Sequence, residues 1–138
     1  MKVREDVEWV VADTLARGRR PGYFQGRSVS RVEVDAWIDN VHALGVKSII
    51  CLLGDDQLPF YGELETDLIS YYRGAGFEVA HVPARDHHTP PLSGDQLTAI
   101  WDAYQRLPKP VLVHCSAGID RTGRAVEYLQ RRLRENPD

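Results

Sequence analysis

The stretch VLVHCSAGIDRTG, residues 111–123, joins a short apolar run to a glycine-containing loop and the start of a helical pattern. Val111–His114 has the β-branched, apolar composition of a buried strand, and apolar residues at helical spacing follow at Val126, Leu129 and Leu133. A strand that turns directly into a helix presents the unpaired N–H groups of the helix N-terminus to the loop. Together with the helix dipole, these groups can bind an anion the size of phosphate. The stretch therefore predicts a strand–loop–helix unit with an anion-binding loop.

The rest of the chain alternates between strand and helix patterns. Short apolar runs predict further strands at Val7–Val11, Val46–Leu53 and Phe77–Val82. Apolar residues at helical spacing predict four helices: one after Ser30 that ends at Gly45, one through Leu64–Tyr72 that ends at Gly74 or Gly76, one capped by Ser93, and one after Arg121. Strands separated by helices form parallel crossovers. We therefore expect an α/β fold with a central, mostly parallel sheet of four to five strands flanked by helices on both faces.

Length, charge and composition exclude several classes of protein. The 138 residues are enough for one domain, which we expect to span residues 1–138. Seventeen basic and twenty acidic residues give a net charge of −3, so the chain lacks the basic field of a nucleic-acid binder, and we expect no nucleic-acid partner. No apolar run approaches the ~20 residues of a membrane-spanning helix, and charged residues interrupt Met1–Asp13. We expect a cytoplasmic protein without stable membrane insertion.

Cys51 and Cys115 are the two cysteines of the chain. A chain of this length does not depend on a disulfide for stability, so we expect free thiols in a reducing compartment. Under oxidation, the two could form a reversible disulfide if their Cα atoms approach within ~7 Å. The alternative is that Cys51 simply packs in its strand.

Cys115 and Arg121 lie near the two ends of the predicted anion-binding loop. The thiolate is the nucleophilic form of cysteine, and N–H groups and a nearby cation both stabilise it. The guanidinium of Arg121 can bind two phosphate oxygens at once and match the charge that spreads over them during phosphoryl transfer. An isolated Cys115 would be interpreted as a small buried hydrophobe, but its loop favours a nucleophile.

The sequence HCSAGIDRTG, from His114 to Gly123, resembles the signature loop of cysteine-dependent protein tyrosine and dual-specificity phosphatases, in particular the compact dual-specificity enzymes. The match is specific because a histidine, a glycine and a hydroxyl residue accompany the Cys-x5-Arg pattern. Cys51 provides an internal comparison, since Gln57 stands where that pattern would need arginine. The chain is of the length of a minimal catalytic domain of this superfamily.

The resemblance implies a role for each residue of the loop. Cys115 would form a phosphocysteine, Arg121 would bind the substrate and the transition state, and Thr122 would assist breakdown of the intermediate. His114 would orient the cysteine, although a satisfied core histidine is an equal interpretation. The phosphate would contact the loop residues Ser116, Ala117, Gly118, Ile119, Asp120 and Arg121.

Asp86 is the candidate general acid. A phosphate ester needs an acid to protonate its leaving group and then a base to activate water, and one carboxylate can serve both steps. Asp86 follows the predicted strand Phe77–Val82, and so lies at the same sheet edge as the loop. Residues 82–91, with Asp86 before a proline pair, are similar to the acid loop of compact dual-specificity phosphatases. The alternatives are a turn aspartate with a local backbone role, or Asp95 as the acid.

Some residues depart from the tyrosine phosphatase pattern. An Asp-His pair, as at Asp86 and His87, also resembles phosphoinositide phosphatases, but Ser116 and Ile119 stand where those enzymes carry lysines. Asp120 replaces a usually small residue, and its carboxylate would weaken polyanion binding if it pointed inward. His87 and His88 match no metal-ligand spacing, so we expect neither a metal site nor a cofactor.

These patterns together predict a cysteine-dependent phosphomonoesterase of the protein tyrosine and dual-specificity type. Phosphotyrosine in proteins is the expected substrate on family grounds, with phosphoserine and phosphothreonine as further substrates. A phosphoinositide or a small phosphate ester is the alternative substrate. A catalytically inactive module that only binds phosphate is the alternative of a different class.

Overall fold

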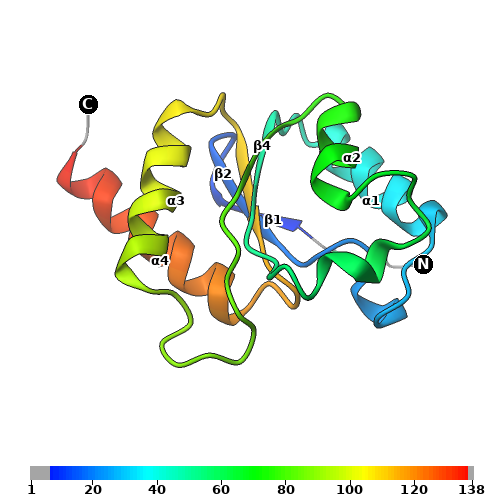
Figure 1. Cartoon of the computed structure of the whole chain (residues 1–138). Helices are drawn as coiled ribbons and strands as arrows, with labels where there is room; N and C mark the ends of the chain where they lie inside the picture. The colour runs from blue at the N-terminus through cyan, green and yellow to red at the C-terminus, as the bar shows by residue number, and fades with distance from the viewer. Residues whose placement is uncertain (1–6, 137–138) are drawn as a thin grey trace.

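A five-stranded sheet runs through the centre of the molecule (Figure 1). The structure, a computed structural model, describes residues 7–136. β5 lies in the middle and runs parallel to β2 and β3, β4 runs parallel to β3, and β1 is the antiparallel edge partner of β2. The strands, in the spatial order β1-β2-β5-β3-β4, are β1 (Val7–Val11), β2 (Leu15–Gly18), β3 (Ser48–Cys51), β4 (Glu78–His81) and β5 (Val111–His114). The predicted α/β fold with a mostly parallel sheet is confirmed.

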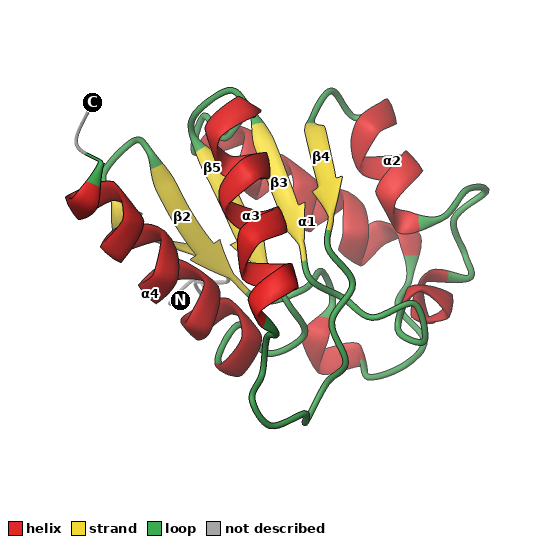
Figure 2. Cartoon of the chain, turned by 60° about the vertical axis from the view of Figure 1, so that its left-hand side comes forward, coloured by secondary structure: helices red, strands yellow, loops and turns green. Residues whose placement is uncertain are grey.

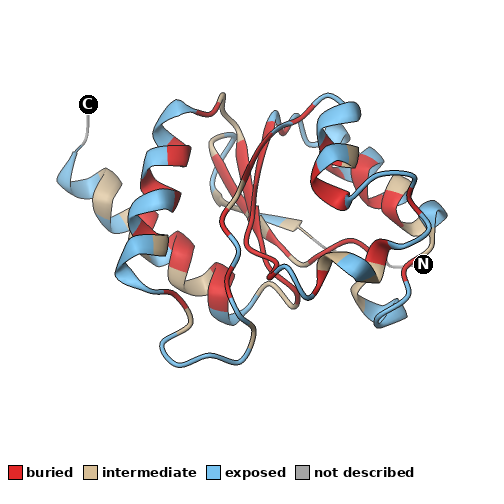
Figure 3. Cartoon of the chain, in the orientation of Figure 1, coloured by how far each residue is buried: buried red, intermediate tan, exposed pale blue. Residues whose placement is uncertain are grey.

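Helices cover both faces of this sheet (Figure 2). α1 (Arg31–Ala43) and α2 (Leu68–Gly74) contribute to one buried cluster, and α3 (Gly94–Arg106) and α4 (Asp120–Glu135) contribute to the other. Figure 3 shows the buried residues on the strands and on the helix surfaces that face them. Each helix therefore has the apolar stripe that packing against one side of a sheet requires.

Polar caps explain where the helices begin. Ser30 accepts a hydrogen bond from the backbone of Glu33, and Ser93 forms a reciprocal capping box with Gln96. α2 begins later than predicted, because the side chain of Asp67 caps it at Ser70 and leaves Leu64 in the preceding turn. The prediction of one helix through Leu64–Tyr72 was therefore wrong at its start.

The strand β2 has no counterpart in the sequence prediction. Its four residues include Arg17 and Gly18, so they give no apolar or alternating pattern. Leu15 and Ala16 are nevertheless fully buried, and β2 is held between β1 and β5. Tertiary pairing, rather than local propensity, makes this segment a strand.

The four parallel strands end at one edge of the sheet, and the segments that follow them meet there (Figure 2). These segments contain two short 3₁₀ turns, η1 (Tyr23–Gln25) after β2 and η2 (Leu58–Tyr61) after β3. Ligands bind at this edge in open parallel sheets. Across residues 7–136, no helix is long and apolar enough to cross a membrane.

Candidate active site

The loop that follows β5 turns the chain into α4. We refer to residues 115–121 as the phosphate loop. Gly118 has a φ of 76°, and a Cβ atom at this position would lie 2.7 Å from the carbonyl oxygen of Gly18. Only glycine fits such a close approach and such a φ without strain. The phosphate loop is therefore packed directly against the end of β2.

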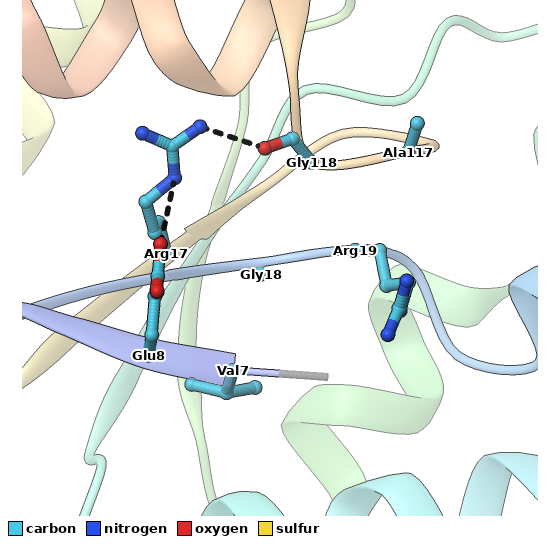
Figure 4. Close-up of a pocket in the computed structure, with 7 residues that line it drawn as sticks. All are labelled: Val7, Glu8, Arg17, Gly18, Arg19, Ala117 and Gly118. Atoms are coloured by element: carbon cyan, nitrogen blue, oxygen red, sulfur yellow. Dashed lines mark hydrogen bonds and ion pairs between the residues drawn. The ribbon is translucent and has the colours of Figure 1, made fainter. Parts of the chain in front are cut away.

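Two arginines, Arg17 in β2 and Arg20 just after it, form hydrogen bonds with this loop. Arg17 Nη2 donates to the carbonyl oxygen of Gly118 at 2.8 Å, and the same side chain pairs with Glu8 at 3.8 Å (Figure 4). The backbone N–H of Arg20 donates to the Ser116 carbonyl oxygen at 2.9 Å, and Arg20 Nε donates to Ser116 Oγ at 3.1 Å. Figure 4 shows a small pocket at the back of the loop, lined by Arg17, Gly18 and Arg19 on one side and by Ala117 and Gly118 on the other. The missed strand β2 thus helps to set the shape of the phosphate loop.

His114 is fully buried at the end of β5, beside the nucleophile candidate. Burial lowers the pKa of His114 to about 4, so the imidazole is neutral. Burial also raises the pKa of Tyr72 well above its ordinary value, so the Tyr72 hydroxyl keeps its proton and donates to His114 Nε2 at 2.9 Å. His114 Nδ1 then carries the hydrogen and donates to the carbonyl oxygen of Cys115 at 2.9 Å. His114 is both a satisfied core histidine and a direct support of Cys115.

Arg121 lies at the start of α4 and is only 2% exposed. Its Nη1 atom donates to the carbonyl oxygens of Leu52 at 3.2 Å and Ala84 at 2.8 Å, and to Gln57 Oε1 at 2.9 Å. Nε and Nη2 have no hydrogen-bond partner among the described residues, and the same holds for the buried Thr122 Oγ1. Unpaired buried donors are rare in folded proteins. One edge of this guanidinium is therefore held by the protein, and the other is left to bind something else.

The structure brings Asp86 to Arg121. Asp86 Oδ1 lies 3.3 Å from Arg121 Nη2 and accepts the backbone N–H of His87 at 3.0 Å. Asp86 is therefore part of the site and also makes the local contact of a turn aspartate. Asp95 lies in the first turn of α3 and does not line the pocket that contains Asp86.

A pocket of about 690 Å³ connects these groups. Cys115, Arg121 and Asp86 line it together. Aromatic walls come from the two short turns at this edge, with Tyr23 and Phe24 in η1 and Phe60 in η2. The pocket is therefore large enough for a phosphate and an attached aromatic or aliphatic group.

The remaining loop residues differ in how they face this pocket. Ser116 is buried, Ala117 is half-buried, and both line the pocket. Ile119 is 65% exposed, and no side chain caps the start of α4. Asp120 is exposed in the first turn of α4 and also lines the pocket. Its carboxylate therefore lies both at a helix start, where a negative charge is favourable, and at the rim of the site.

Cys51 is a fully buried thiol in β3, whose register partner in β5 is His114. Burial raises the pKa of Cys51 to about 12, so this thiol stays protonated. Both cysteines are free thiols.

His87 and His88 are both exposed beside the site. His87 Nε2 lies 3.7 Å from Asp86 Oδ2, its side chain is 88% exposed, and His88 Nδ1 contacts the carbonyl oxygen of Pro90. Within residues 7–136, no group of three or more His, Cys, Asp or Glu side chains is arranged to hold a metal ion.

Sequence reasoning missed two residues of this site. Arg20 is 4% exposed and contacts Ser116, and it follows a strand that the sequence did not reveal. Gln57 is 5% exposed and contacts both Arg121 and Asp86. A signal for Gln57 did exist, because it follows an apolar strand at the carboxyl edge where polar residues collect.

A family model described as a DSP-PTPase phosphatase of polymorphic toxin systems matches residues 31–131 of the chain. The matched range contains Gln57, Asp86, Cys115 and Arg121, whereas Arg20 precedes it. A comparison with curated proteins finds no match.

Several solved structures have a similar fold. Tk-PTP, in a mutant form, is 24% identical with a TM-score of 0.63, and the match covers 92% of this chain and 72% of Tk-PTP. A DUF442 protein from Shewanella putrefaciens CN-32 is 19% identical with a TM-score of 0.67, covering 96% and 75% of the two chains. The core catalytic domain of the PP-IP phosphatase SIW14 from S. cerevisiae is 20% identical with a TM-score of 0.58, covering 92% and 65%. At these identities the likeness establishes the fold.

Proposed function

The chain belongs to the DSP-PTPase phosphatase family of polymorphic toxin systems, and from this premise we propose that it hydrolyses phosphotyrosine in proteins, with phosphoserine and phosphothreonine as further substrates. One observation supports the phosphate site above all others. Among the described residues, Nε and Nη2 of the buried Arg121 guanidinium have no hydrogen-bond partner, and Nη2 has only the ion-pair contact with Asp86 Oδ1 at 3.3 Å, in the pocket that Cys115 and Asp86 also line. A bound phosphate would pair both donors through two of its oxygens.

The proposed reaction has two steps. In the first, the Cys115 thiolate attacks phosphorus, the S–P bond forms, the P–O bond to the leaving group breaks, and Asp86 gives its proton to the departing oxygen. In the second, Asp86 takes a proton from water, the water oxygen bonds to phosphorus, and the S–P bond breaks to return the thiolate. Arg121 binds the equatorial oxygens throughout. By resemblance to the family, Thr122 would assist the breakdown of the phosphocysteine, and its buried Oγ1 has no hydrogen-bond partner among the described residues.

The pocket is lined by three arginines, Arg20, Arg27 and Arg121, and by two carboxylates, Asp86 and Asp120. Arg20 is a second buried cation there, but its Nε, Nη1 and Nη2 already donate to Ser116, Tyr61 and Gly26. The carboxylate of Asp120 stands at the rim and would repel further negative charge. Aromatic side chains of η1 and η2 offer apolar surface for the group that carries the phosphate.

Hydrolysis of para-nitrophenyl phosphate in excess EDTA tests the enzymatic part of the proposal. Wild type should turn over and Cys115→Ser should not, because serine at this position lacks a stable anion. If wild type does not turn over, the chain is a phosphate-binding module or lacks the site, and vanadate titration separates these two outcomes.

A panel of phosphorylated substrates tests the proposed preference for phosphotyrosine in proteins. We expect kcat/KM on phosphotyrosine peptides to exceed that on inositol phospholipids and on small sugar phosphates by at least tenfold. A preference of about threefold or less for the peptides would contradict the proposed substrate class.

A further inference from the structure

Gln57 lies in a tight turn directly after β3. Its backbone N–H donates to the Gly54 carbonyl oxygen at 2.9 Å, and the Gly54 N–H donates back to Gln57 Oε1 at 3.1 Å. The residue is 5% exposed, so the protein largely shields its side-chain amide from water. The turn therefore holds a buried amide at the carboxyl edge of the sheet, inside the pocket that contains Cys115.

The hydrogen-bond partners determine the positions of Oε1 and Nε2 in the Gln57 amide. Gly54 N and Arg121 Nη1 can only donate, and both lie at Oε1, at 3.1 Å and 2.9 Å. The amide nitrogen Nε2 must then face the opposite side, where it donates to Asp86 Oδ2 at 3.4 Å. A flipped amide would place its N–H₂ group against two donors and its oxygen against a carboxylate. A single side chain thus contacts the phosphate-binding arginine and the candidate acid through different atoms.

Arg121 depends on this contact for its orientation. Leu52, Ala84 and Gln57 supply three acceptors around Nη1, and they come from the segments after β3 and β4. Gln57 supplies the only side-chain acceptor among these contacts. With Nη1 occupied in this way, Nε and Nη2 form the free edge of the guanidinium, the edge without a hydrogen-bond partner among the described residues, and only the carboxylate of Asp86 lies near it, 3.3 Å from Nη2.

Asp86 accepts a hydrogen bond from the nitrogen of the same amide. In the structure it accepts from donors on both oxygens: Arg121 Nη2 and the His87 N–H lie at Oδ1, and Gln57 Nε2 lies at Oδ2. When a phosphate binds Arg121, its negative charge competes for Nη2 and repels an ionised Asp86. The Gln57 amide is neutral and buried, so it can keep its contact with Asp86 in either protonation state.

We propose that Gln57 is a positioning residue that couples the phosphate clamp to the general acid, holding Asp86 at the site while Arg121 turns its free edge to the substrate. The inference rests on the proposed function, because it assigns Asp86 and Arg121 their roles there. An amide suits this task better than a carboxylate, since it accepts from Arg121 and donates to Asp86 at the same time.

Two variants of Gln57 separate its two contacts. Gln57→Leu removes both the acceptor and the donor. Gln57→Glu keeps an acceptor for Arg121 and Gly54 but replaces the donor to Asp86 with a negatively charged oxygen. Gln105→Leu is the matched control, because Gln105 is exposed on α3 and does not line the pocket. Circular dichroism and thermal unfolding establish that each variant is folded, and Gln57→Glu carries the test if Gln57→Leu does not fold.

The main readout is the dependence on the leaving group. Gln57→Leu should lower kcat/KM on phenyl phosphate, a poor leaving group, by about tenfold to a hundredfold, and weaken vanadate binding about tenfold. Gln57→Glu places a negative charge beside Arg121, so vanadate binding should weaken as well, but kcat should decrease more on phenyl phosphate than on para-nitrophenyl phosphate. Its carboxylate should also move the basic limb of the pH–rate profile to higher pH. Gln105→Leu should match wild type in every assay.

A double-mutant cycle tests the coupling itself. In an Asp86→Asn background, Gln57→Glu should cost less than about threefold in kcat on phenyl phosphate, because the acid it positions is already removed. Full additivity, or Gln57 variants that behave like wild type while wild type is active, would overturn this inference and leave the proposed function intact. Absence of wild-type turnover would instead overturn the proposed function, and with it the role of Gln57 in positioning Asp86. Vanadate binding would then still test the contact with Arg121.

Discussion

Arg20 and Arg121 are two buried arginines in contact with the same site, and they use their guanidinium groups differently. Arg20, after β2, pairs each nitrogen with an acceptor in the protein: Nε with Ser116, Nη1 with Tyr61 and Nη2 with Gly26. Arg121, at the start of α4, directs one nitrogen to three acceptors, and its Nε and Nη2 have no hydrogen-bond partner among the described residues. A buried cation with a hydrogen-bond partner for each nitrogen can be kept for the fold alone, whereas a buried nitrogen without a partner is costly unless a ligand pairs it. The two residues therefore show how burial alone fails to distinguish a structural arginine from one that binds substrate.

The largest expected effect comes from Arg121→Lys. Lysine keeps the charge but loses the planar fork, so it cannot pair two phosphate oxygens and also hold the three acceptors around Nη1. We expect kcat/KM on para-nitrophenyl phosphate to fall about a thousandfold, as when charge-stabilising donors are removed from other active sites. A decrease of less than about tenfold would mean that the unpaired donors are not the substrate contact.

The second prediction concerns His114, whose pKa is lowered to about 4 by burial and, to a lesser extent, by the charges of Arg121 and Arg20. An unfolded chain would protonate this histidine near its ordinary pKa of about 6.5, so the unfolded state binds more protons between these values. Stability from the neutral imidazole is therefore fully present above about pH 6.5 and is lost as the pH falls through about 4.

We expect the free energy of unfolding to decrease by about 3 kcal/mol over that pH interval, and His114→Gln to remove most of this dependence. Urea unfolding at several pH values measures it. If the free energy of unfolding of His114→Gln depends on pH as steeply as that of wild type, groups other than His114 cause the dependence.

Much of the fold could be predicted because its signals are local. β5 coincides with the predicted Val111–His114, and the side chains of Ser30 and Ser93 cap the helices that they were expected to start. β2 was not predicted because its two buried residues, Leu15 and Ala16, are followed by Arg17 and Gly18. Only pairing with β1 and β5 makes this segment extended. Period and propensity are properties of the segment itself, whereas pairing depends on segments far along the chain.

The same distinction divides the residues of the site. Cys115 and Arg121 lie in one contiguous motif, and Asp86 could be placed because parallel strands end at one edge of the sheet. Arg20 and Gln57 act through contacts 96 and 64 residues away in the sequence, with Ser116 and Arg121 respectively. No spacing rule predicts such contacts. The charge state of an arginine can be read from the sequence, but whether its donors are paired cannot.

Arg20→Met should reverse the pattern of Arg121→Lys. The change leaves Ser116, Tyr61 and Gly26 without their arginine donors, so we expect the free energy of unfolding to decrease by about 2 kcal/mol. Activity at saturating substrate should decrease by less than about tenfold, because each nitrogen of Arg20 already donates to an acceptor in the protein. Urea unfolding and kcat measured on the same preparation give both numbers. A thousandfold loss of kcat with unchanged stability would place Arg20 in direct contact with the substrate.

Asp120→Asn should have the smallest effect, because Asp120 is an exposed charge at the rim of the site, whereas Arg20 and Arg121 are buried. Removing it should lower KM for a dianionic phosphate ester by about twofold to threefold at low ionic strength, and the difference should vanish at high salt because exposed charges are screened. Asp95→Asn is the matched control, since Asp95 also lies in the first turn of a helix but outside the pocket, and it should leave KM unchanged. Both variants should lose about 0.5 kcal/mol of stability, because each removes a favourable charge at a helix N-terminus. A salt-independent change in KM for Asp120→Asn would instead show that its carboxylate enters the site and contacts the phosphate-binding groups directly.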